Sequence, residues 1–165
     1  MRPVKLVIWR HGQTDWNVEE RFQGHTDIPL NRTGELQVKL AAKKLIELNP
    51  TQIISSDLTR AKQTAAALSE LAQIPVRSFE QLRETNGGNW EGNFDSETRT
   101  ADKVNWVRWI AGEDIRAGGV GESRSMVGKR VKDFLDPVIE TLEDQETEDE
   151  AVLVVVTHGG TERER

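Results

Sequence analysis

Six consecutive apolar residues at 151–156 (AVLVVV) place the tightest constraint on the fold of this 165-residue chain. A strand without a polar position has to be covered on both faces, as the inner strands of parallel sheets are. Three further strands are predicted at 5–9, 52–55 and 76–79, each with an apolar or β-branched pattern. We therefore expect a central sheet with a layer of helices on each side.

Helical patterns lie between these strands, at residues 33–48, 57–72 and 123–142. Strands that alternate with helices predict βαβ units and a mainly parallel sheet. The expected fold class is α/β: a three-layer α/β/α sandwich in a single domain that covers residues 1–165. Pro137 lies inside the last helical pattern, which predicts either a kink there or two separate helices.

The stretch at 84–121 differs from the rest of the chain. It holds seven of the 13 glycines and three of the five tryptophans, and its only regular pattern is a short helix at 104–111. These features predict a long loop that acts as a lid or a substrate-specificity loop. Arginines in or beside it are expected to be available for a second anionic group on a substrate: Arg83, Arg99, Arg108, Arg116 and Arg124.

Composition narrows the function classes. The net charge of −6 argues against nucleic-acid binding, which needs a basic surface. The apolar run near the N-terminus is too short for a signal peptide, and no stretch has the length of a membrane span, so we expect a cytoplasmic protein with no membrane partner. Cysteine is absent, and the three histidines show no metal-ligand spacing, so neither a metal nor another cofactor is predicted.

Polar clusters follow three of the predicted strands. Arg10, His11 and Gly12 follow the first, the segment SSDLTRA at 55–61 follows the second, and THGG at 157–160 follows the last. In open parallel sheets, ligands bind outside the carboxyl ends of the strands. We therefore expect these clusters to converge on one site, although they are far apart in the sequence.

The residue types in these clusters suit a phosphoryl group. Arg10 and Arg60 offer the planar, permanently charged guanidinium groups that phosphate oxygens prefer. A histidine between arginines is kept unprotonated and can act as a nucleophile, while glycines allow the backbone to approach closely. Taken alone, His158 would more often be a structural histidine, and Arg60 would more often be a charge on a helix surface, so the inference depends on their combination.

Six stretches of the chain together resemble the histidine phosphatase superfamily, also called phosphoglycerate mutase-like. They are residues 10–17 (RHGQTDWN), 23–31 (QGHTDIPLN), 55–64 (SSDLTRAKQT), 82–84 (LRE), 90–92 (WEG) and 157–160 (THGG). The resemblance spans nearly the whole chain, and it implies catalysis through a phosphohistidine without a metal.

The resemblance also implies which residues form the site. The catalytic set is His11 as the nucleophile, Glu84 as the proton donor and later the base for water, and His158 beside the phosphate. The implied phosphate-binding residues are Arg10, Asn17, Gln23, Gly24, Arg60 and Gly159. The expected partner is a small phosphorylated metabolite.

The chain is more similar to the phosphatase branch than to the mutases. Glycolytic mutases carry a longer insertion after the glutamate with a distinctive tyrosine, whereas this chain has no tyrosine. The spacing of Trp109 and the GESR stretch at 121–124 is similar to actinobacterial glucosyl-3-phosphoglycerate phosphatases. A mutase-type phosphoryl transferase and an inactive phospho-ligand-binding module remain the alternatives.

The end of the sequence departs from the family pattern. Members usually continue past the second histidine with an apolar helix, whereas residues 161–165 (TERER) are charged. We expect apolar surface beside the last strand to be exposed or covered by a second copy in a homodimer, with His158 less firmly held.

Overall fold

Strand β4 (Ala151–Thr157) lies inside the sheet, as its apolar sequence predicts. In the computed structural model, which describes residues 1–159, the sheet has four strands in the order β1-β4-β2-β3. The other strands are β1 (Val4–Arg10), β2 (Gln52–Ser56) and β3 (Val76–Phe79), and every pair is parallel. The predictions for Gly160 and for the tail at 161–165 lie outside the described residues.

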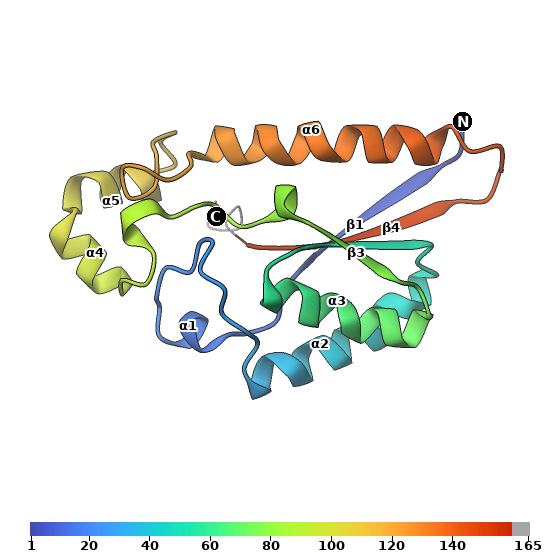
Figure 1. The fold of residues 1–165 in the computed structure, drawn as a ribbon, viewed down its shortest axis with the longest axis horizontal. Helices are drawn as coiled ribbons and strands as arrows, with labels where there is room; N and C mark the ends of the chain where they lie inside the picture. The colour runs from blue at the N-terminus through green and yellow to red at the C-terminus, as the bar shows by residue number, and fades with distance from the viewer. Residues whose placement is uncertain (160–165) are drawn as a thin grey trace.

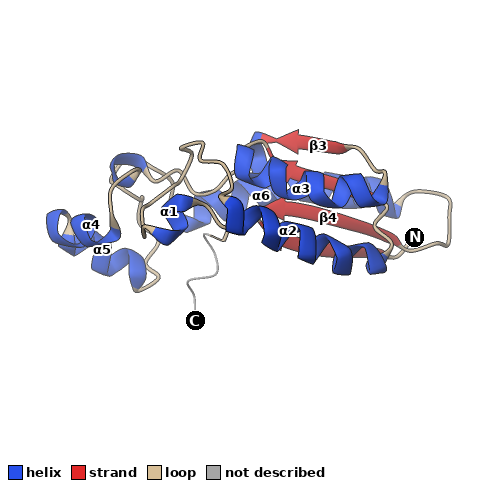
Figure 2. Ribbon diagram, turned by 90° about the horizontal axis from the view of Figure 1, so that it is seen from below, coloured by secondary structure: helices blue, strands red, loops and turns tan. Residues whose placement is uncertain are grey.

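Helices cover both faces of the sheet (Figures 1 and 2). Helices α2 (Arg32–Leu45) and α3 (Thr59–Ala72) pack on one face, and α6 (Arg124–Glu143) lies along the other. Alternate residues of β4 serve the two layers: Val154 and Val156 belong to the core under α2 and α3, while Leu153 and Val155 belong to the core under α6. The predicted three-layer α/β/α fold is confirmed.

Helix α2 buries a different face from the one its leucines indicate. Leu36 and Leu40 are exposed, whereas Val38 and Ala42 are buried. Gly34 explains the choice, because a Cβ there would lie 2.1 Å from the Gln13 carbonyl oxygen. The helix approaches the Gln13 backbone closely along its face of small residues, and Leu36 and Leu40 remain on the opposite side. A short 3-10 helix, η1 (Ile46–Leu48), follows it.

Helix α6 runs as one element of 20 residues through Pro137. The sequence predicted either a kink or two separate helices at this proline. The second of these predictions is therefore wrong. Pro137 is on the exposed side of the helix. The carbonyl that loses its helical partner can therefore be solvated, which lowers the penalty for an internal proline.

The segment at 84–121 contains more regular structure than its sequence indicates. It holds η3 (Gly88–Trp90), α4 (Asp95–Ala101) and α5 (Lys103–Ile110), of which α4 was not predicted. Trp90 packs edge-on against Trp106 and Trp109, with ring centroids 5.6 and 5.8 Å apart. The three indoles build a small separate core, so the segment is a packed helical unit at the end of the sheet (Figure 1).

Strand β1, which pairs with β4, carries the exposed apolar side chains Leu6 and Ile8, at 41% and 57% exposure. Apolar surface is therefore exposed beside the last strand, and the expected link between this surface and the tail at 161–165 stays a prediction. Whether a second copy covers it stays a prediction. No helix among residues 1–159 is long and apolar enough to cross a membrane.

Candidate active site

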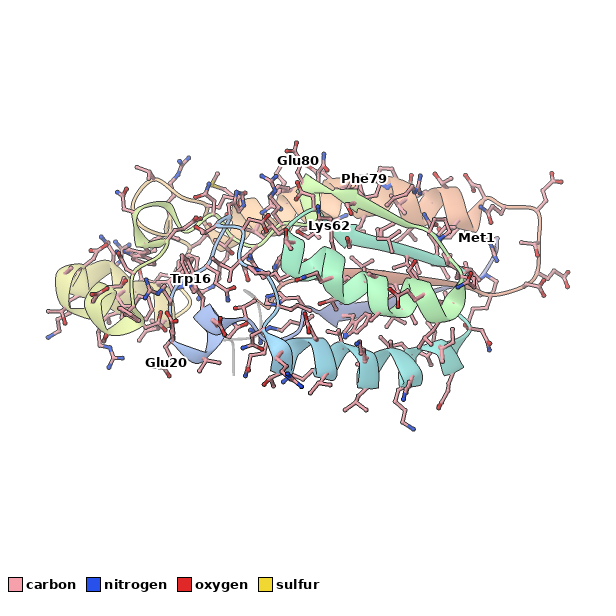
Figure 3. The ribbon with its side chains drawn as sticks, turned by 60° about the horizontal axis from the view of Figure 1, so that its bottom comes forward. Met1, Trp16, Glu20, Lys62, Phe79 and Glu80 are labelled. Carbon is pink, nitrogen blue, oxygen red and sulfur yellow. The ribbon has the colours of Figure 1, made fainter. Side chains whose placement is uncertain are left out.

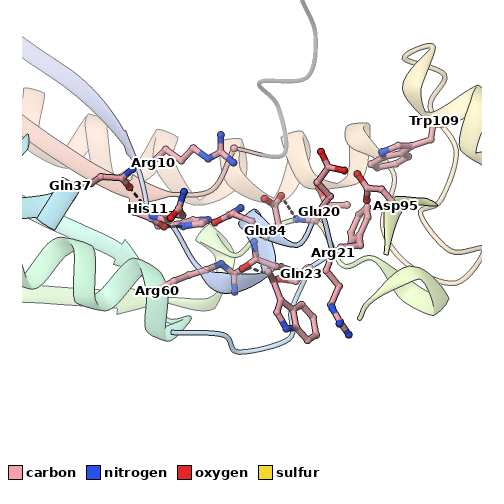
Figure 4. A pocket seen from close by; sticks show the side chains of 18 residues that line it. Arg10, His11, Glu20, Arg21, Gln23, Gln37, Arg60, Glu84, Asp95 and Trp109 are labelled. Atoms are coloured by element: carbon pink, nitrogen blue, oxygen red, sulfur yellow. Dashed lines mark hydrogen bonds between the residues drawn. The ribbon is translucent and has the colours of Figure 1, made fainter. Parts of the chain in front are cut away.

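The carboxyl ends of β1, β2 and β4 open onto a cavity of about 550 Å³ (Figure 4). Figure 3 shows Trp16 and Glu20 at this end of the molecule, with Met1 at the opposite end. Eight of the nine predicted site residues line the cavity: Arg10, His11, Asn17, Gln23, Gly24, Arg60, Glu84 and Gly159. The ninth, His158, lies against the ring of His11. The structure therefore brings together all nine residues.

The backbone after β1 fixes the position of His11. Its N–H donates to the carbonyl of Thr157 at 3.0 Å, which extends the β1–β4 ladder by one residue. The N–H of Gly12 donates to Thr64 Oγ1 at 3.1 Å. A Cβ on Gly12 would lie 2.8 Å from the Gly34 carbonyl oxygen, so this turn requires glycine. The turn thus presents His11 at the strand end, with the backbone N–H groups of His11 and Gly12 both hydrogen-bonded.

The ring of His11 has a defined tautomer. Nδ1 lies 2.7 Å from the carbonyl oxygen of Gly12, and a carbonyl can only accept, so Nδ1 carries the hydrogen. Nε2 therefore keeps its lone pair. Burial lowers the pKa of His11 from 6.5 to about 4; the Gly12 hydrogen bond opposes this shift, and the charges of Arg60 and Arg10 add to it. At neutral pH the ring is an uncharged nitrogen nucleophile.

His158 faces His11 from the end of β4. The two ring centroids are 5.1 Å apart. Burial is the largest cause that lowers the pKa of His158 well below its usual value, followed by the charge of Arg60. Neither ring nitrogen of His158 has a hydrogen-bond partner within the described part of the chain. Buried polar atoms normally find partners, so this ring can offer a donor to a ligand.

Arg60 is fully buried at the start of α3, just after β2. Its Nη1 donates to the carbonyl of Thr26 at 2.9 Å and its Nη2 to that of Gly24 at 2.8 Å. Its Nε is buried without a partner among residues 1–159. A buried guanidinium is expensive unless it meets an anion, so Arg60 favours a negatively charged ligand in the cavity.

Asn17 and Gln23 are oriented by a shared neighbour, Thr14. Asn17 Oδ1 accepts from the backbone N–H of Thr14 at 2.9 Å, within the capping box of the short helix α1 (Asp15–Val18). Gln23 Oε1 lies 2.8 Å from the Thr14 hydroxyl oxygen. Because both side-chain oxygens are engaged by Thr14, both amide groups keep their N–H donors for an anion.

Glu84 lies just after the 3-10 helix η2 (Glu80–Leu82), which directly follows β3. Its Oε1 accepts from the N–H of Thr85 at 2.7 Å, and its charge acts on Arg60. Figure 4 shows this carboxyl between the His11 end of the cavity and the far wall. A carboxyl group there is suited to exchange a proton with a ligand in the cavity.

The sequence predicted that the 84–121 segment lies near the substrate, but not which individual residues form the far part of the cavity. Its wall comes from α1, the loop after it and the 84–121 segment, and the residues that sequence analysis did not assign to the site are Gln13, Trp16, Glu20, Arg21, Phe22, Gln37, Thr85, Asp95 and Trp109. Several of these lie within or next to the stretches that resemble the family, which is the one signal that could have indicated them.

The five arginines expected to receive a second anion do not line the described cavity. Arg83 donates to both carboxylate oxygens of Asp57, at 2.7 and 2.6 Å. Arg108 pairs with Glu113 at 2.7 Å. Arg21, which was not predicted, is the additional arginine on the cavity wall.

Within residues 1–159, no group of three or more His, Asp or Glu side chains is arranged to hold a metal ion. The predicted independence from metals and cofactors concerns the reaction itself, so it remains to be tested by experiment.

Comparisons with known proteins agree with this geometry. Residues 6–163 match the family model described as histidine phosphatase superfamily (branch 1). A glucosyl-3-phosphoglycerate phosphatase of Mycolicibacterium vanbaalenii is 37% identical over 97% of this chain and 71% of its own length. A probable phosphoglycerate mutase of Escherichia coli is 34% identical over 94% of this chain and 70% of its own.

A solved structure shows the same fold. The mycobacterial glucosyl-3-phosphoglycerate phosphatase in complex with VO3 superposes with a TM-score of 0.86 at 35% identity. The match covers 94% of this chain and 76% of that one.

Proposed function

The chain belongs to the histidine phosphatase superfamily, and on this premise we propose that it hydrolyses the phosphomonoester of a small metabolite through a phosphohistidine at His11. One observation carries the proposal. His11 has an unprotonated Nε2, and it stands at the end of the cavity that Arg60 also lines, with the ring of His158 beside its own. A neutral nucleophile beside a buried cation is the arrangement that phosphoryl transfer to nitrogen requires.

In the first step, His11 Nε2 attacks phosphorus and the bond from phosphorus to the ester oxygen breaks. Arg10, Arg60 and the amides of Asn17 and Gln23 hold the three peripheral oxygens, where negative charge is spread. Glu84 gives its proton to the departing alkoxide, which leaves as an alcohol. The Gly12 carbonyl on Nδ1 stabilises the positive charge that the ring acquires when Nε2 bonds to phosphorus.

In the second step, the Glu84 carboxylate takes a proton from a water molecule that attacks the phosphohistidine. The nitrogen–phosphorus bond breaks, inorganic phosphate leaves, and both His11 and Glu84 return to their starting states. One carboxyl group therefore serves as acid and then as base, and the balance of the cycle is ester plus water to alcohol plus phosphate.

Glucosyl-3-phosphoglycerate is the proposed first candidate among substrates. Support comes from the curated mycobacterial relatives named for it, which match 97% of this chain. The cavity volume of about 550 Å³ also leaves room beyond the phosphate end for a leaving group larger than glycerate.

A mutase-type transferase is the second candidate, because a probable phosphoglycerate mutase is also among the relatives. A mutase would keep its phosphohistidine long enough to return the group to an acceptor alcohol. A phosphatase would pass it to water within each turnover. The two candidates thus differ in the lifetime of the same intermediate.

The test is phosphate release from a panel of sugar phosphates, phosphoglycerates and glucosyl-3-phosphoglycerate, with His11→Ala as the matched inactive variant. We expect release with at least one ester and none above background with the variant. Transfer of a labelled phosphoryl group from one phosphoglycerate to another, without release of phosphate, would support the mutase instead of the phosphatase. If no ester gives either release or transfer, the inactive phospho-ligand-binding module is the remaining candidate.

A further inference from the structure

The backbone of Glu84 is held by side chains that have no part in the steps above. Its carbonyl oxygen accepts from His25 Nε2 at 2.9 Å and from Arg130 Nη2 at 3.3 Å. Because a carbonyl can only accept, Nε2 of His25 must carry a hydrogen. Two donors from separate parts of the chain thus converge on the peptide unit that bears the proposed acid.

Arg130 extends from α6 with its side chain 21% exposed. Its Nη1 donates to the carbonyls of Gln81 at 2.7 Å and Arg83 at 3.1 Å, so together with Glu84 it holds three carbonyls of one short segment. Its Nε and Nη2 donate to the two carboxylate oxygens of Glu122, both at 2.9 Å. This fork fixes the guanidinium plane, and a lysine cannot reproduce it.

Glu122 ties the same segment from the other side. Its Oε2 accepts from the N–H of Asn86 at 2.9 Å, and its own N–H donates to the Asn86 carbonyl at 2.9 Å. The side chain of Glu122 is 17% exposed. The backbone from Gln81 to Asn86 is therefore held on both sides of Glu84 by one ion pair.

His25 connects this arrangement to the phosphate end of the cavity. The carbonyls of its two neighbours, Gly24 and Thr26, accept hydrogen bonds from Arg60 Nη2 and Nη1, respectively. The backbone N–H of His25 donates to Glu91 Oε1 at 2.8 Å. One three-residue segment thus binds the phosphate-binding arginine through its backbone and the acid-bearing peptide through its side chain.

We propose that Arg130 and His25, with Glu122, are positioning residues that set the Glu84 carboxyl at the distance and angle required for proton transfer to the leaving oxygen. The proposal rests on the function proposed above. None of these three side chains lines the described cavity, so all three act through Glu84 rather than on the substrate. Proton transfer depends steeply on geometry, so a small shift of this peptide slows both steps that use Glu84. Of these two steps, kcat/KM reports only the first, because it covers the reaction up to release of the alcohol.

The experiment compares an alkyl phosphate ester with a nitrophenyl phosphate ester in Arg130→Lys and in the pair His25→Leu and His25→Gln. Alkyl esters need a proton on the leaving oxygen, whereas nitrophenyl esters need little. We expect kcat/KM for the alkyl ester to fall about 10- to 100-fold in Arg130→Lys and His25→Leu, which is at or below the lower end of the roughly 10²- to 10⁴-fold effect of a complete general acid, with kcat/KM for the nitrophenyl ester within about threefold. His25→Gln keeps an N–H donor and should recover part of the loss.

Arg83→Lys is the matched control. Arg83 is adjacent to Glu84 and also forms a two-bond ion pair, but with Asp57 rather than with the acid's backbone. The Arg83→Lys variant should leave the ratio of the alkyl rate to the nitrophenyl rate unchanged. On a Glu84→Gln background, Arg130→Lys should cause no further loss on the alkyl ester, because the acid on which it acts is already absent.

Equal losses on both esters, or the same loss on the Glu84→Gln background as in the wild type, would overturn the proposal and leave Arg130 a stabilising residue. If Arg130→Lys does not fold, the two His25 variants carry the same comparison. A wild-type chain that hydrolyses neither ester would instead refute the proposed function. A wild type that hydrolyses both esters, with variants that keep its rate ratio, would refute only the positioning role.

Discussion

The rings of His11 and His158 lie with their centroids 5.1 Å apart and their planes tilted by 59°. Burial is the main cause that lowers the pKa of both, so the pair is neutral near pH 7. Two imidazolium ions at this distance, beside Arg60, would repel each other strongly. In the proposed mechanism, burial therefore keeps one ring available as a nucleophile, while the other can donate a hydrogen bond to the incoming phosphate.

A covalent phosphohistidine should be recoverable at His11. Brief incubation with phosphorus-labelled substrate and an alkaline quench should retain protein-bound label, whereas an acid quench should remove it, because phosphoramidates are acid-labile. His158→Gln, which keeps a donor, should slow labelling without moving the site. Label that survives acid, or that persists in His11→Ala, would show that the intermediate lies on another residue.

Stability should fall as the pH drops from about 6.5 to about 4. In this window the unfolded His11 binds a proton that the folded residue, with its pKa lowered to about 4, does not bind. Unfolding is then favoured, and the shift corresponds to roughly 3 kcal/mol, fully lost once the pH is below the folded pKa. Urea unfolding midpoints of wild type and His11→Gln, measured from pH 7.5 to 4, test this.

The unfolding midpoint of His11→Gln should depend less steeply on pH than that of the wild type. Some dependence should remain, because His158 and the paired carboxylates titrate in both proteins. Identical slopes for the two proteins would show that His11 is not held neutral by the fold.

Glu84→Gln should separate substrates by their leaving groups. The amide keeps the size of the side chain but cannot give a proton, so we expect kcat/KM to fall about 100-fold or more for alkyl esters and far less for nitrophenyl esters. A series of phenyl phosphates with graded leaving-group pKa values measures this as a steeper slope in the variant. An equal loss along the series would remove the acid role.

The site was easier to predict from the sequence than the wall around it. Arg10, Arg60 and His158 follow strands whose apolar patterns are unambiguous, and parallel strands bring their carboxyl ends to one edge. The far wall depends on Trp109, which packs with Trp90 and Trp106, and on Asp95, whose backbone N–H donates to the carbonyl of Glu20 at 2.8 Å. Such packing is a tertiary property that no local pattern encodes.

Helix α2 shows the same limit at the level of one element. Its helical period was predictable, but both the leucine face and the face with Gly34, Val38 and Ala42 repeat with that period. The approach of Gln13 to Gly34, which comes from a distant part of the sequence, decides between the two faces. Likewise, the contact between His25 and the Glu84 backbone joins residues 59 positions apart.

Activity should not depend on an added metal. The proposed steps place the phosphoryl charge on Arg10, Arg60 and amide donors. Dialysis against a chelator, followed by assay with and without Mg²⁺, Mn²⁺ and Zn²⁺, should leave the turnover within about twofold. Loss of turnover with the chelator and recovery with one ion would contradict this mechanism.

Gly159→Ala should weaken phosphate binding through Arg10. A Cβ at position 159 would lie 2.5 Å from Arg10 Nε and 2.6 Å from Cζ, which is closer than real contacts allow. The neighbour that has to move is the end of a flexible side chain, so the fold should tolerate the change while the guanidinium leaves its place at the cavity. A displaced charged donor is worth about 1.5–3 kcal/mol, which predicts a rise in KM of roughly 10-fold or more with little change in unfolding midpoint.

Gly128→Ala in α6 is the matched control for Gly159→Ala, because a Cβ there meets nothing within 4 Å. It should leave KM unchanged and stabilise the helix by roughly 0.5–1 kcal/mol. The double variant Arg10→Ala with Gly159→Ala then isolates the route of the effect. If the alanine acts only by displacing Arg10, it adds nothing once that guanidinium is gone, and the two losses are not additive. Additive losses would mean that residue 159 meets the phosphate by itself, through its own backbone rather than through the arginine beside it.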